Sequence, residues 1–443
     1  MTRRFATPCF FVAQVGACIL AGCGSDEGAP PSVDASVDAT ADTSTASDAA
    51  APPVGSVDAL GNEAGGGVAV KGIVVVNSDY QSSSISFLDR DGNLVKDGCL
   101  TSGSGSQGYT LTLSGDVVLP SRQPSGGEVV VIDRTNAALT WLDSATCAPL
   151  RQLAVGTGFA SNPHDLVMLT PTKAYVSRYG ENAKATPPAD DFDDGDDLLI
   201  IDPSQPKILG RIDLKSYAPA GVNILPLADR AILIEGKVYL SLNGIASDWT
   251  AYGTGRIVMV DPTTDKVVGM IDIPGAKDCG ALDYLAAEQK LVVACQGSTG
   301  AQGADTSALV AIDLSVTPPA VVAQVSAAAA GGSAFSYSSI AALSGSNVFG
   351  VALGNFGAPP PDQLWSVSFA GTSPVKVFAS TEGFALGALL ADVEKGRIVV
   401  ADGPTTSAAL VRIFDLVAGT FSTAKTTDAD PSHHLPPRAL AWY

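Results

Sequence analysis

The sequence predicts an all-β protein, a ring of seven four-stranded antiparallel blades known as a β-propeller. Composition is the first indication, because only 16% of residues are charged, 46% are hydrophobic and 46 are glycine, with few long stretches of helical periodicity. The second is a repeat in which short apolar runs alternate with polar loops and one run in each copy ends in aspartate.

The clearest copy of this repeat spans residues 237–273. Lys237–Leu242 is one apolar strand, Arg256–Asp261 is a second that ends in aspartate, and Lys266–Ile273 follows after a short turn. An aspartate side chain accepts hydrogen bonds from backbone amides two residues further on, and proline fixes φ, so Asp261-Pro262 predicts a tight turn. With the strand that precedes it, each copy supplies the four short strands of a propeller blade.

Seven copies are present. The third strand of each is expected to end at Leu88–Asp89, Ile132–Asp133, Ile201–Asp202, Val260–Asp261, Ile312–Asp313, Val367–Ser368 or Phe414–Asp415. The first copy supplies only three strands, whereas the chain ends in a lone strand at 436–443. We expect this last strand to become the innermost strand of blade one, because closing the ring removes the free sheet edges at the seam.

These copies resemble the YVTN-type repeats of surface-layer-like, YncE-like β-propellers. That consensus runs strand, polar loop, Val-x-Val-Ile-Asp-x-x-Thr-x-Lys-Val-Val, then a further strand. The fourth copy matches it well, the third, fifth and seventh match in part, and the sixth departs by placing Ser368 where aspartate is expected. The resemblance covers most of residues 72–443 and implies the fold, but says little about function.

The N-terminus reads as an export signal. Arg3 and Arg4 precede an apolar run, Phe10–Leu20, that is too short to span a bilayer. The sequence Leu20-Ala-Gly-Cys23 resembles the lipobox of bacterial lipoproteins, which implies a signal peptide over 1–22 and a lipid attached to Cys23. The alternative is an ordinary secreted protein whose cleavage site contains a cysteine.

Residues 23–67 form a predicted acidic tether, followed by the propeller at 68–443. The tether is rich in Asp, Ala, Ser, Thr, Pro and Gly and contains no Lys or Arg. Such a segment cannot bury enough apolar surface to offset the entropy of ordering, so we expect it to be disordered. Gly24 and Ser25 lack the aspartate that retains enteric lipoproteins in the inner membrane. The resemblance therefore implies an exported protein at the outer membrane or cell surface rather than at the inner membrane.

The net charge of the protein limits the kinds of partner that it can bind. The formal charge is −19, and it becomes about −21 once Arg3 and Arg4 leave with the signal peptide. This excludes nucleic acid, which requires a basic surface. The expected partners are the membrane, through the lipid anchor, and an unknown protein, glycan or small-molecule ligand, with the protein itself a monomer.

Four cysteines remain after Cys9 and Cys18 are removed and Cys23 is lipidated. Two disulfides are expected in an exported chain. Cys279 and Cys295 flank one predicted hairpin and are paired on that ground, which leaves Cys99 with Cys147 by elimination. The alternative is four buried free thiols.

The connections between second and third strands vary most in length. The longest are 178–196, 243–255, 296–307 and 354–363. In a propeller these loops share a face with the connections that lead into the innermost strands, and insertions gathered on one face are typical of a binding face.

The first of these loops contains a metal candidate. Ca²⁺ favours closely spaced carboxylate oxygens. The acidic positions are Asp190, Asp191, Asp193, Asp194, Asp196 and Asp197. The cluster does not match an EF-hand, because Gly195 stands where a ligand is required. A solvated acidic loop is the alternative, and no other cofactor is predicted.

All three histidines, His164, His433 and His434, lie in predicted connections into innermost strands. Such connections surround the mouth of the central channel, where the histidines would converge with Asp165 and Asp278 as acid, base or ligands for Zn, Cu, Ni or Fe. The alternative is isolated loop residues bonded to backbone carbonyls.

The sequence contains no haem-attachment motif, nucleophile elbow or phosphate-binding loop. A lipid-anchored binding or interaction module is therefore favoured over catalysis. The alternative is an envelope hydrolase, lactonase-like, or a metal-dependent enzyme with its site at the channel mouth. A structural envelope component is the third possibility.

Overall fold

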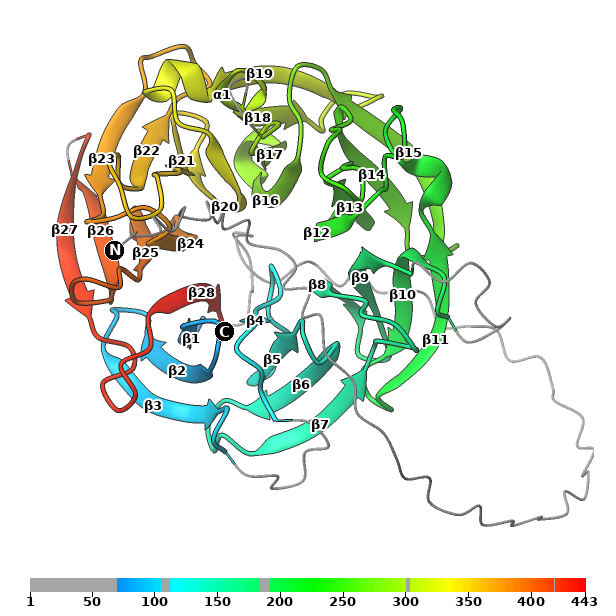
Figure 1. The fold of residues 1–443 in the computed structure, drawn as a ribbon, viewed down its shortest axis with the longest axis horizontal. Helices are drawn as coiled ribbons and strands as arrows, with labels where there is room; N and C mark the ends of the chain where they lie inside the picture. Colours follow the sequence, from blue (N-terminus) through cyan, green and yellow to red (C-terminus); the bar gives the residue numbers. More distant parts are fainter. Residues whose placement is uncertain (1–69, 105–111, 183–191, 300–302, 418) are drawn as a thin grey trace, which may run out of the picture. The chain divides into compact units, whose positions relative to one another are not determined.

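The computed structural model describes residues 70–104, 112–182, 192–299, 303–417 and 419–443. Over these residues the chain forms seven four-stranded antiparallel sheets in a ring, which confirms the predicted fold (Figure 1). The predicted signal peptide, Cys23 and the whole of the predicted tether lie outside the described residues. No helix in the described part of the chain is long and apolar enough to cross a membrane.

Each blade is built outward from the channel. From the innermost strand, blade one consists of β28 (Pro437–Trp442), β1 (Gly72–Ser78), β2 (Ser83–Asp89) and β3 (Leu94–Thr101); blade two of β4 (Val117–Val118), β5 (Glu128–Asp133), β6 (Ala138–Asp143) and β7 (Pro149–Ala154); blade three of β8 (Pro163–Thr170), β9 (Lys173–Glu181), β10 (Gly195–Asp202) and β11 (Lys207–Asp213); blade four of β12 (Ala228–Ile234), β13 (Lys237–Leu242), β14 (Gly255–Asp261) and β15 (Lys266–Ile273).

Blade five consists of β16 (Cys279–Leu285), β17 (Lys290–Cys295), β18 (Ala308–Asp313) and β19 (Ala320–Ser326); blade six of β20 (Phe335–Ser344), β21 (Asn347–Ala352), β22 (Gln363–Val367) and β23 (Val375–Ala379); blade seven of β24 (Leu386–Asp392), β25 (Arg397–Asp402), β26 (Leu410–Val417) and β27 (Thr420–Thr427). The described helices are the four-residue α1 (Gly303–Thr306) and the short 3₁₀ turns η1 (Lys215–Tyr217), η2 (Ala286–Glu288) and η3 (Ala327–Ala330).

The hydrophobic core lies between the blades. Seven main clusters of buried side chains each join two neighbouring blades, including the pair across the seam. The two middle strands of each blade have a neighbouring blade on either side. In β17, accordingly, all residues from Leu291 to Cys295 are buried. An outer strand faces solvent on one side, and β15 shows alternating exposure. The uninterrupted apolar runs in the sequence are therefore middle strands.

The C-terminal strand closes the ring, as predicted. β28 pairs antiparallel with β1, with Ile73 opposite Trp442 and Val75 opposite Leu440. Beyond the strand, the amide of Lys71 donates to the carbonyl of Tyr443 at 2.7 Å. The first and last strands of the domain thus belong to one sheet.

The turn role predicted for aspartate is also confirmed. Asp261 Oδ1 accepts hydrogen bonds from the amide of Thr263 at 2.8 Å and from its hydroxyl at 2.6 Å. Asp202 and Asp313 accept the amide two residues further on in the same way. These bonds fix the turn between third and fourth strands.

One strand assignment from the sequence is wrong. Ile132–Asp133 ends the second strand of blade two, β5, and the third strand is β6, which ends at Leu142–Asp143. The innermost strand of this blade is regular only at Val117–Val118. Because residues 119–127 leave the sheet, this blade has no long apolar run at its first strand. The sequence-based prediction therefore took the second strand of the blade for its third.

Both predicted disulfides are present. Cys279 and Cys295 are cross-strand partners in β16 and β17, with Cα atoms 3.9 Å apart. Cys99 in β3 bonds Cys147 in the turn before β7, with Cα atoms 5.4 Å apart. The second bridge covalently joins blades one and two.

Candidate functional site

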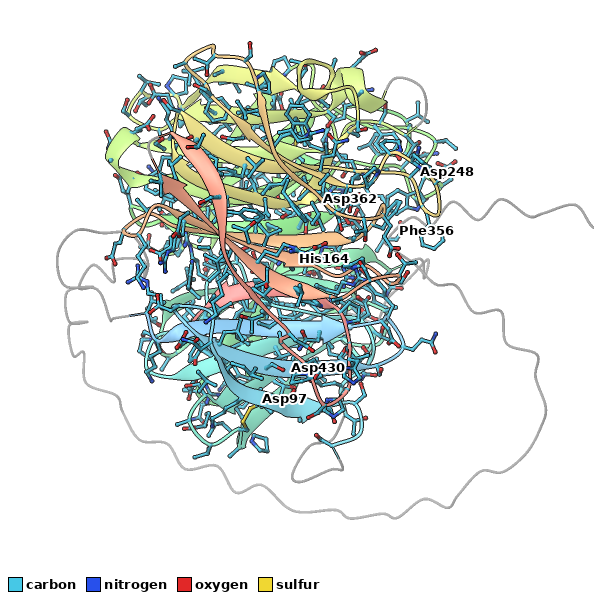
Figure 2. All side chains as sticks on the ribbon, turned by 90° about the vertical axis from the view of Figure 1, so that its left-hand side faces the viewer. Asp97, His164, Asp248, Phe356, Asp362 and Asp430 are labelled. Carbon is cyan, nitrogen blue, oxygen red and sulfur yellow. A yellow bond between two sulfur atoms is a disulfide. The ribbon has the colours of Figure 1, made fainter. Side chains whose placement is uncertain are left out.

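The long loops share one face with the connections into the innermost strands, as predicted. The amide of Asn243 bonds the carbonyl of Leu227 at 3.1 Å, that of Gln296 bonds Asp278 at 2.9 Å, and equivalent bonds occur in blades three and six. We call this the loop face. Figure 2 shows Asp248 and Phe356 on it. The backbone bond between Lys71 and Tyr443 lies at the opposite end of β1, so the first described residues and the C-terminus meet at the other face.

At the loop-face end of the channel, His164 of β8 forms a pair with Asp229 of β12. Nδ1 lies 2.7 Å from Asp229 Oδ1, and both side chains are buried. A charged carboxylate only accepts hydrogen bonds, so Nδ1 carries the shared proton. The imidazole stacks on Tyr179 with ring centroids 4.3 Å apart. Nε2 of His164 and Oδ2 of Asp229 are buried without a hydrogen-bond partner among the described residues.

Burial lowers the pKa of His164, while the charge of Asp229 opposes that shift. The imidazole is therefore held neutral near physiological pH, with Nε2 free of a proton. A neutral imidazole oriented by a carboxylate is suited to accept a proton or a ligand hydrogen bond at its second nitrogen.

Asp278, in the connection leading into β16, belongs to the same region. Its Oδ1 accepts a hydrogen bond from Asn243 Nδ2, whose own Oδ1 is buried without a described partner. Burial raises the pKa of Asp278 to about 7, Asn243 opposes this, and the charge of Asp229 adds to it. Burial raises the pKa of Tyr337 in β20, and the charges of Asp229 and Asp278 add to this shift. We call His164, Asp229, Asn243 and Asp278 the mouth cluster.

Asp165, which was predicted to meet the histidines at the channel mouth, is held by hydrogen bonds from the neighbouring blades. Its carboxylate accepts the amide and hydroxyl of Ser121, at 2.7 and 2.5 Å, and the amide of Ala231 at 2.8 Å. Burial raises its pKa, and nearby Arg230 lowers it. These bonds connect blades two, three and four, so Asp165 holds the inner strands together below the mouth cluster.

His433 and His434 lie in the connection between β27 and β28. His433 Nδ1 is 2.9 Å from Asp430 Oδ1, so it bonds a different carboxylate from His164. His434 is exposed, and its amide donates to the carbonyl of Asp430 at 2.7 Å. His164 and His433 therefore bond different carboxylates, those of Asp229 and Asp430.

Part of the acidic loop is described. Asp190 and Asp191 lie outside the described residues. Asp194 pairs with Arg211, and buried Asp197 forms a two-point ion pair with Arg178 at 2.5 and 2.7 Å. Oδ1 of Asp193 and of Asp196 are buried without a described partner, and burial raises the pKa of Asp196 to about 6. Two of the carboxylates proposed to bind calcium therefore already pair with arginines. Calcium binding at this loop remains a prediction.

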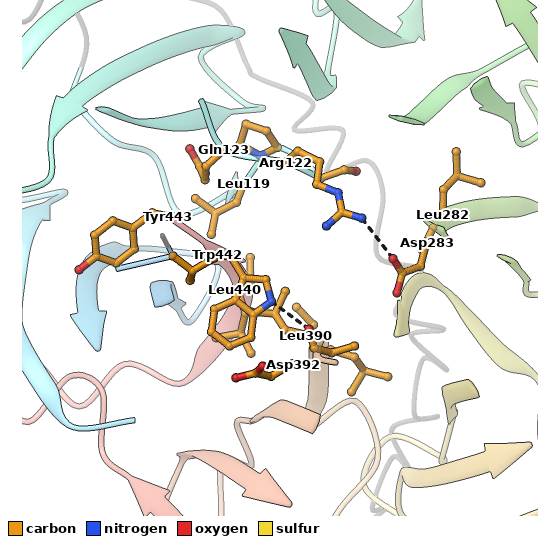
Figure 3. A pocket seen from close by; sticks show the side chains of 18 of the residues that line it. Leu119, Arg122, Gln123, Leu282, Asp283, Leu390, Asp392, Leu440, Trp442 and Tyr443 are labelled. Carbon is orange, nitrogen blue, oxygen red and sulfur yellow. Dashed lines mark hydrogen bonds and ion pairs between the residues drawn. The ribbon is translucent and has the colours of Figure 1, made fainter. Parts of the chain in front are cut away.

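A cavity of about 200 Å³ occupies the channel toward the face where the first described residues and the C-terminus meet, which we call the terminal face (Figure 3). Its walls combine apolar side chains, including Leu119, Leu282, Leu440 and Trp442, with charged ones such as Arg122 and Asp283. An ion pair crosses it from Arg122 in blade two to Asp283 in blade five, with Nη2 and Oδ1 3.3 Å apart. Sequence reasoning missed this cavity, because it depends on where residues 119–127 leave the sheet.

Sequence reasoning also missed Asp229 and Asn243. The sequence does contain a signal that could have found them. The starts of three successive innermost strands carry polar residues, namely His164-Asp165, Asp229-Arg230 and Asp278. Polar residues at the same register position of neighbouring blades meet at the same level of the channel.

Known proteins share the fold but little sequence. No known family model matches the chain, and no curated protein matches it significantly. Similar solved structures include a "putative 6-phosphogluconolactonase" from Bacteroides fragilis (TM-score 0.52, 12% identity, 84% of this chain and 97% of that chain) and one from Bacteroides uniformis (0.52, 11%, 84% and 98%). Hydrazine synthase from Kuenenia stuttgartiensis is another (0.50, 11%, 84% and 100%). At these identities the similarity establishes the fold alone.

Proposed function

We propose that this chain is a lipid-anchored, YVTN-type propeller of the bacterial cell envelope that binds a ligand at the loop-face mouth of its channel. The observation that carries the proposal is the mouth cluster, in which His164 Nε2, Asp229 Oδ2 and Asn243 Oδ1 are buried without described partners. Unpaired buried polar atoms are costly to a fold and are often kept for a ligand.

The chemistry of these atoms indicates the ligand class. All three accept hydrogen bonds, because the proton of the His164 pair lies on Nδ1. A ligand that satisfies them must bring several donors, as an amine or a polyhydroxylated molecule such as a glycan does. Exposed Tyr80, Val222 and Phe356, in loops of the same face, supply apolar contact area for such a ligand.

The envelope location rests on separate observations. The two disulfides support an oxidising compartment outside the cytoplasm. The Leu20-Ala-Gly-Cys23 resemblance supports an anchor before the propeller. The described chain starts at the face opposite the long loops.

The binding proposal is tested with a panel of amines, amino sugars and oligosaccharides, measured by calorimetry on the purified protein. Asp229→Asn removes one charge and exchanges an acceptor for a donor, so affinity for a wild-type ligand should fall at least about tenfold. Asp248→Asn, an exposed loop-face aspartate, is the matched control and should bind normally. Equal affinity of the Asp229→Asn variant, or no ligand in the panel, would contradict the proposal.

A second candidate, hydrolysis, is favoured by one specific observation. The His164–Asp229 pair has the geometry of a general base held by a carboxylate, and Asp278 has a pKa near neutrality. In such a reaction Nε2 removes a proton from water as its oxygen bonds to an ester carbonyl carbon. The acyl C–O bond then breaks, and the protonated imidazole gives its proton to the departing alkoxide oxygen; if protonated Asp278 donates instead, it regains a proton from the imidazolium. An ester yields an acid and an alcohol, and a lactone yields one hydroxy acid.

Lactones are the first substrates to test, since two similar propellers carry that description. His164→Gln keeps a polar side chain but removes the base, and should reduce kcat about 10²-fold or more. His434→Asn should leave the rate unchanged. A His164→Gln variant as fast as the wild type would eliminate this mechanism, and an inactive wild type would leave the binding proposal as the better one.

A further inference from the structure

The geometry points to a divalent transition-metal site at the seam of the ring, formed by Asp97, Asp430 and His433. Asp97 belongs to β3, the outermost strand of blade one, whereas Asp430 and His433 lie in the connection from β27 to the closing strand β28. One imidazole nitrogen and one oxygen from each carboxylate lie within 4.8 Å of one another, and no other such group occurs in the part of the chain that the structure describes.

Hydrogen bonds from the surrounding residues position the two carboxylates of this site. Asp97 Oδ1 is shielded from solvent and has no partner among the described residues, while Oδ2 accepts the amide of Ser432 at 3.1 Å. Asp430 is completely buried, and its carboxylate is fixed by Ser84 Oγ at 2.8 Å and the amide of Leu435 at 3.0 Å. An unpaired, shielded carboxylate oxygen beside a buried carboxylate needs a donor or a cation.

The imidazole is held against the backbone of β3. A Cβ at Gly98, whose φ is +58°, would lie 2.7 Å from His433 Cε1, so a larger residue there would displace the ring from this position. His433 Nδ1 lies 2.9 Å from Asp430 Oδ1, and the side chain is 43% exposed. The ring is thus positioned by protein on one side and open to water on the other, which leaves coordination positions for solvent.

The donor set favours zinc-like metals over calcium. Neutral imidazole suits Zn²⁺, Co²⁺ and Ni²⁺, whereas Ca²⁺ prefers six to eight oxygen ligands. Two carboxylates with a neutral imidazole carry two negative charges, which one divalent cation balances.

A metal here would stabilise the closed ring. Its ligands come from the outer strand of blade one and from the segment that delivers β28 to the inner edge of the same blade, and these meet only in the folded protein. Binding to the folded state alone raises stability with metal concentration. This inference does not depend on the ligand proposed for the mouth cluster, since it uses none of the same residues.

The test uses purified protein freed of metal with a chelator and titrated with Zn²⁺ by calorimetry and with Co²⁺ by visible absorption. We expect one saturable site, Co²⁺ d–d bands that Zn²⁺ abolishes, and a higher Tm with Zn²⁺. His433→Ala and Asp97→Asn should each weaken binding at least about tenfold and lose the Tm increase. Their metal-free melting curves report whether they fold.

His434→Asn is the matched control, because His434 is the neighbouring imidazole and stands at φ +61°, a conformation that asparagine tolerates. It should bind Zn²⁺ like the wild type. No saturable binding by the wild type, equal binding by His433→Ala, or equal loss in His434→Asn would each overturn the proposal.

Discussion

The side-chain amide of Gln123 bonds both backbone groups of Val130, donating from Nε2 to the carbonyl at 3.0 Å and accepting the amide at Oε1 at 2.7 Å. A single side chain thereby replaces the ladder bonds that an innermost strand would make to β5. Residues 119–127 are freed from the sheet, and the cavity toward the terminal face is lined by this segment.

Replacing Gln123 by Ala should therefore destabilise the protein by about 1–3 kcal/mol, because both backbone groups of buried Val130 lose their partner. Denaturant unfolding measures the change. Gln205→Ala, at an exposed glutamine, is the control and should have little effect. An unchanged unfolding midpoint for Gln123→Ala would show that water satisfies these groups.

Deleting Ala439–Tyr443 should abolish cooperative folding. The deletion removes most of β28, which supplies all strand pairing on the inner edge of β1 and buries Leu440 and Ala441. Removing Tyr443 alone keeps every strand pair from Ile73 to Asn77 and should cost much less. Circular dichroism melting distinguishes the two, and a cooperative wild-type transition in the longer deletion would refute the closure role.

The two disulfides should contribute unequally. Cys99–Cys147 closes 48 residues and Cys279–Cys295 closes 16, which in the chain-entropy model corresponds to about 4 and about 3 kcal/mol. Serine pairs at each bridge, compared by denaturant unfolding with and without reductant, measure the difference. A larger loss at Cys279–Cys295 would show that native-state effects outweigh loop entropy.

Asp278→Asn should stabilise the protein more at pH 8 than at pH 5. The folded pKa of Asp278 is raised to about 7 from 3.8, so between these values the folded protein keeps a proton that the unfolded chain has released. Its contribution to stability is thus lost as pH rises toward and through 7, whereas asparagine does not titrate. Thermal melting at both pH values gives the difference, and a pH-independent difference would mean that Asp278 has an ordinary pKa.

The features that could be predicted from the sequence are the periodic and the local ones. The aspartate-ended strands predicted seven blades, the lone final strand predicted closure at β1, and the predicted hairpin between Cys279 and Cys295 predicted their bond. Each of these depends on the order of apolar runs along the chain or on residues a few positions apart.

The sites could not be predicted to the same extent, because they depend on which inner strands are neighbours and on how far each side chain reaches. The partnership of His164 with Asp229, and of Asp97 with Asp430 and His433, follows from contacts between segments that are far apart in the sequence. The order of apolar runs along the chain gives no sign that Gln123 takes over a strand's hydrogen bonds.

The sequence by itself determined the class of fold, the closure of the ring and the face that carries the long loops, since alternation and turn chemistry act locally. Only the tertiary structure decided which buried polar atoms remain unpaired, because pairing depends on distances of a few ångströms between segments up to several hundred residues apart. His164 illustrates both. Its place at the start of an innermost strand was readable from the chain, and its bond to Asp229 was set by the packing of blades three and four.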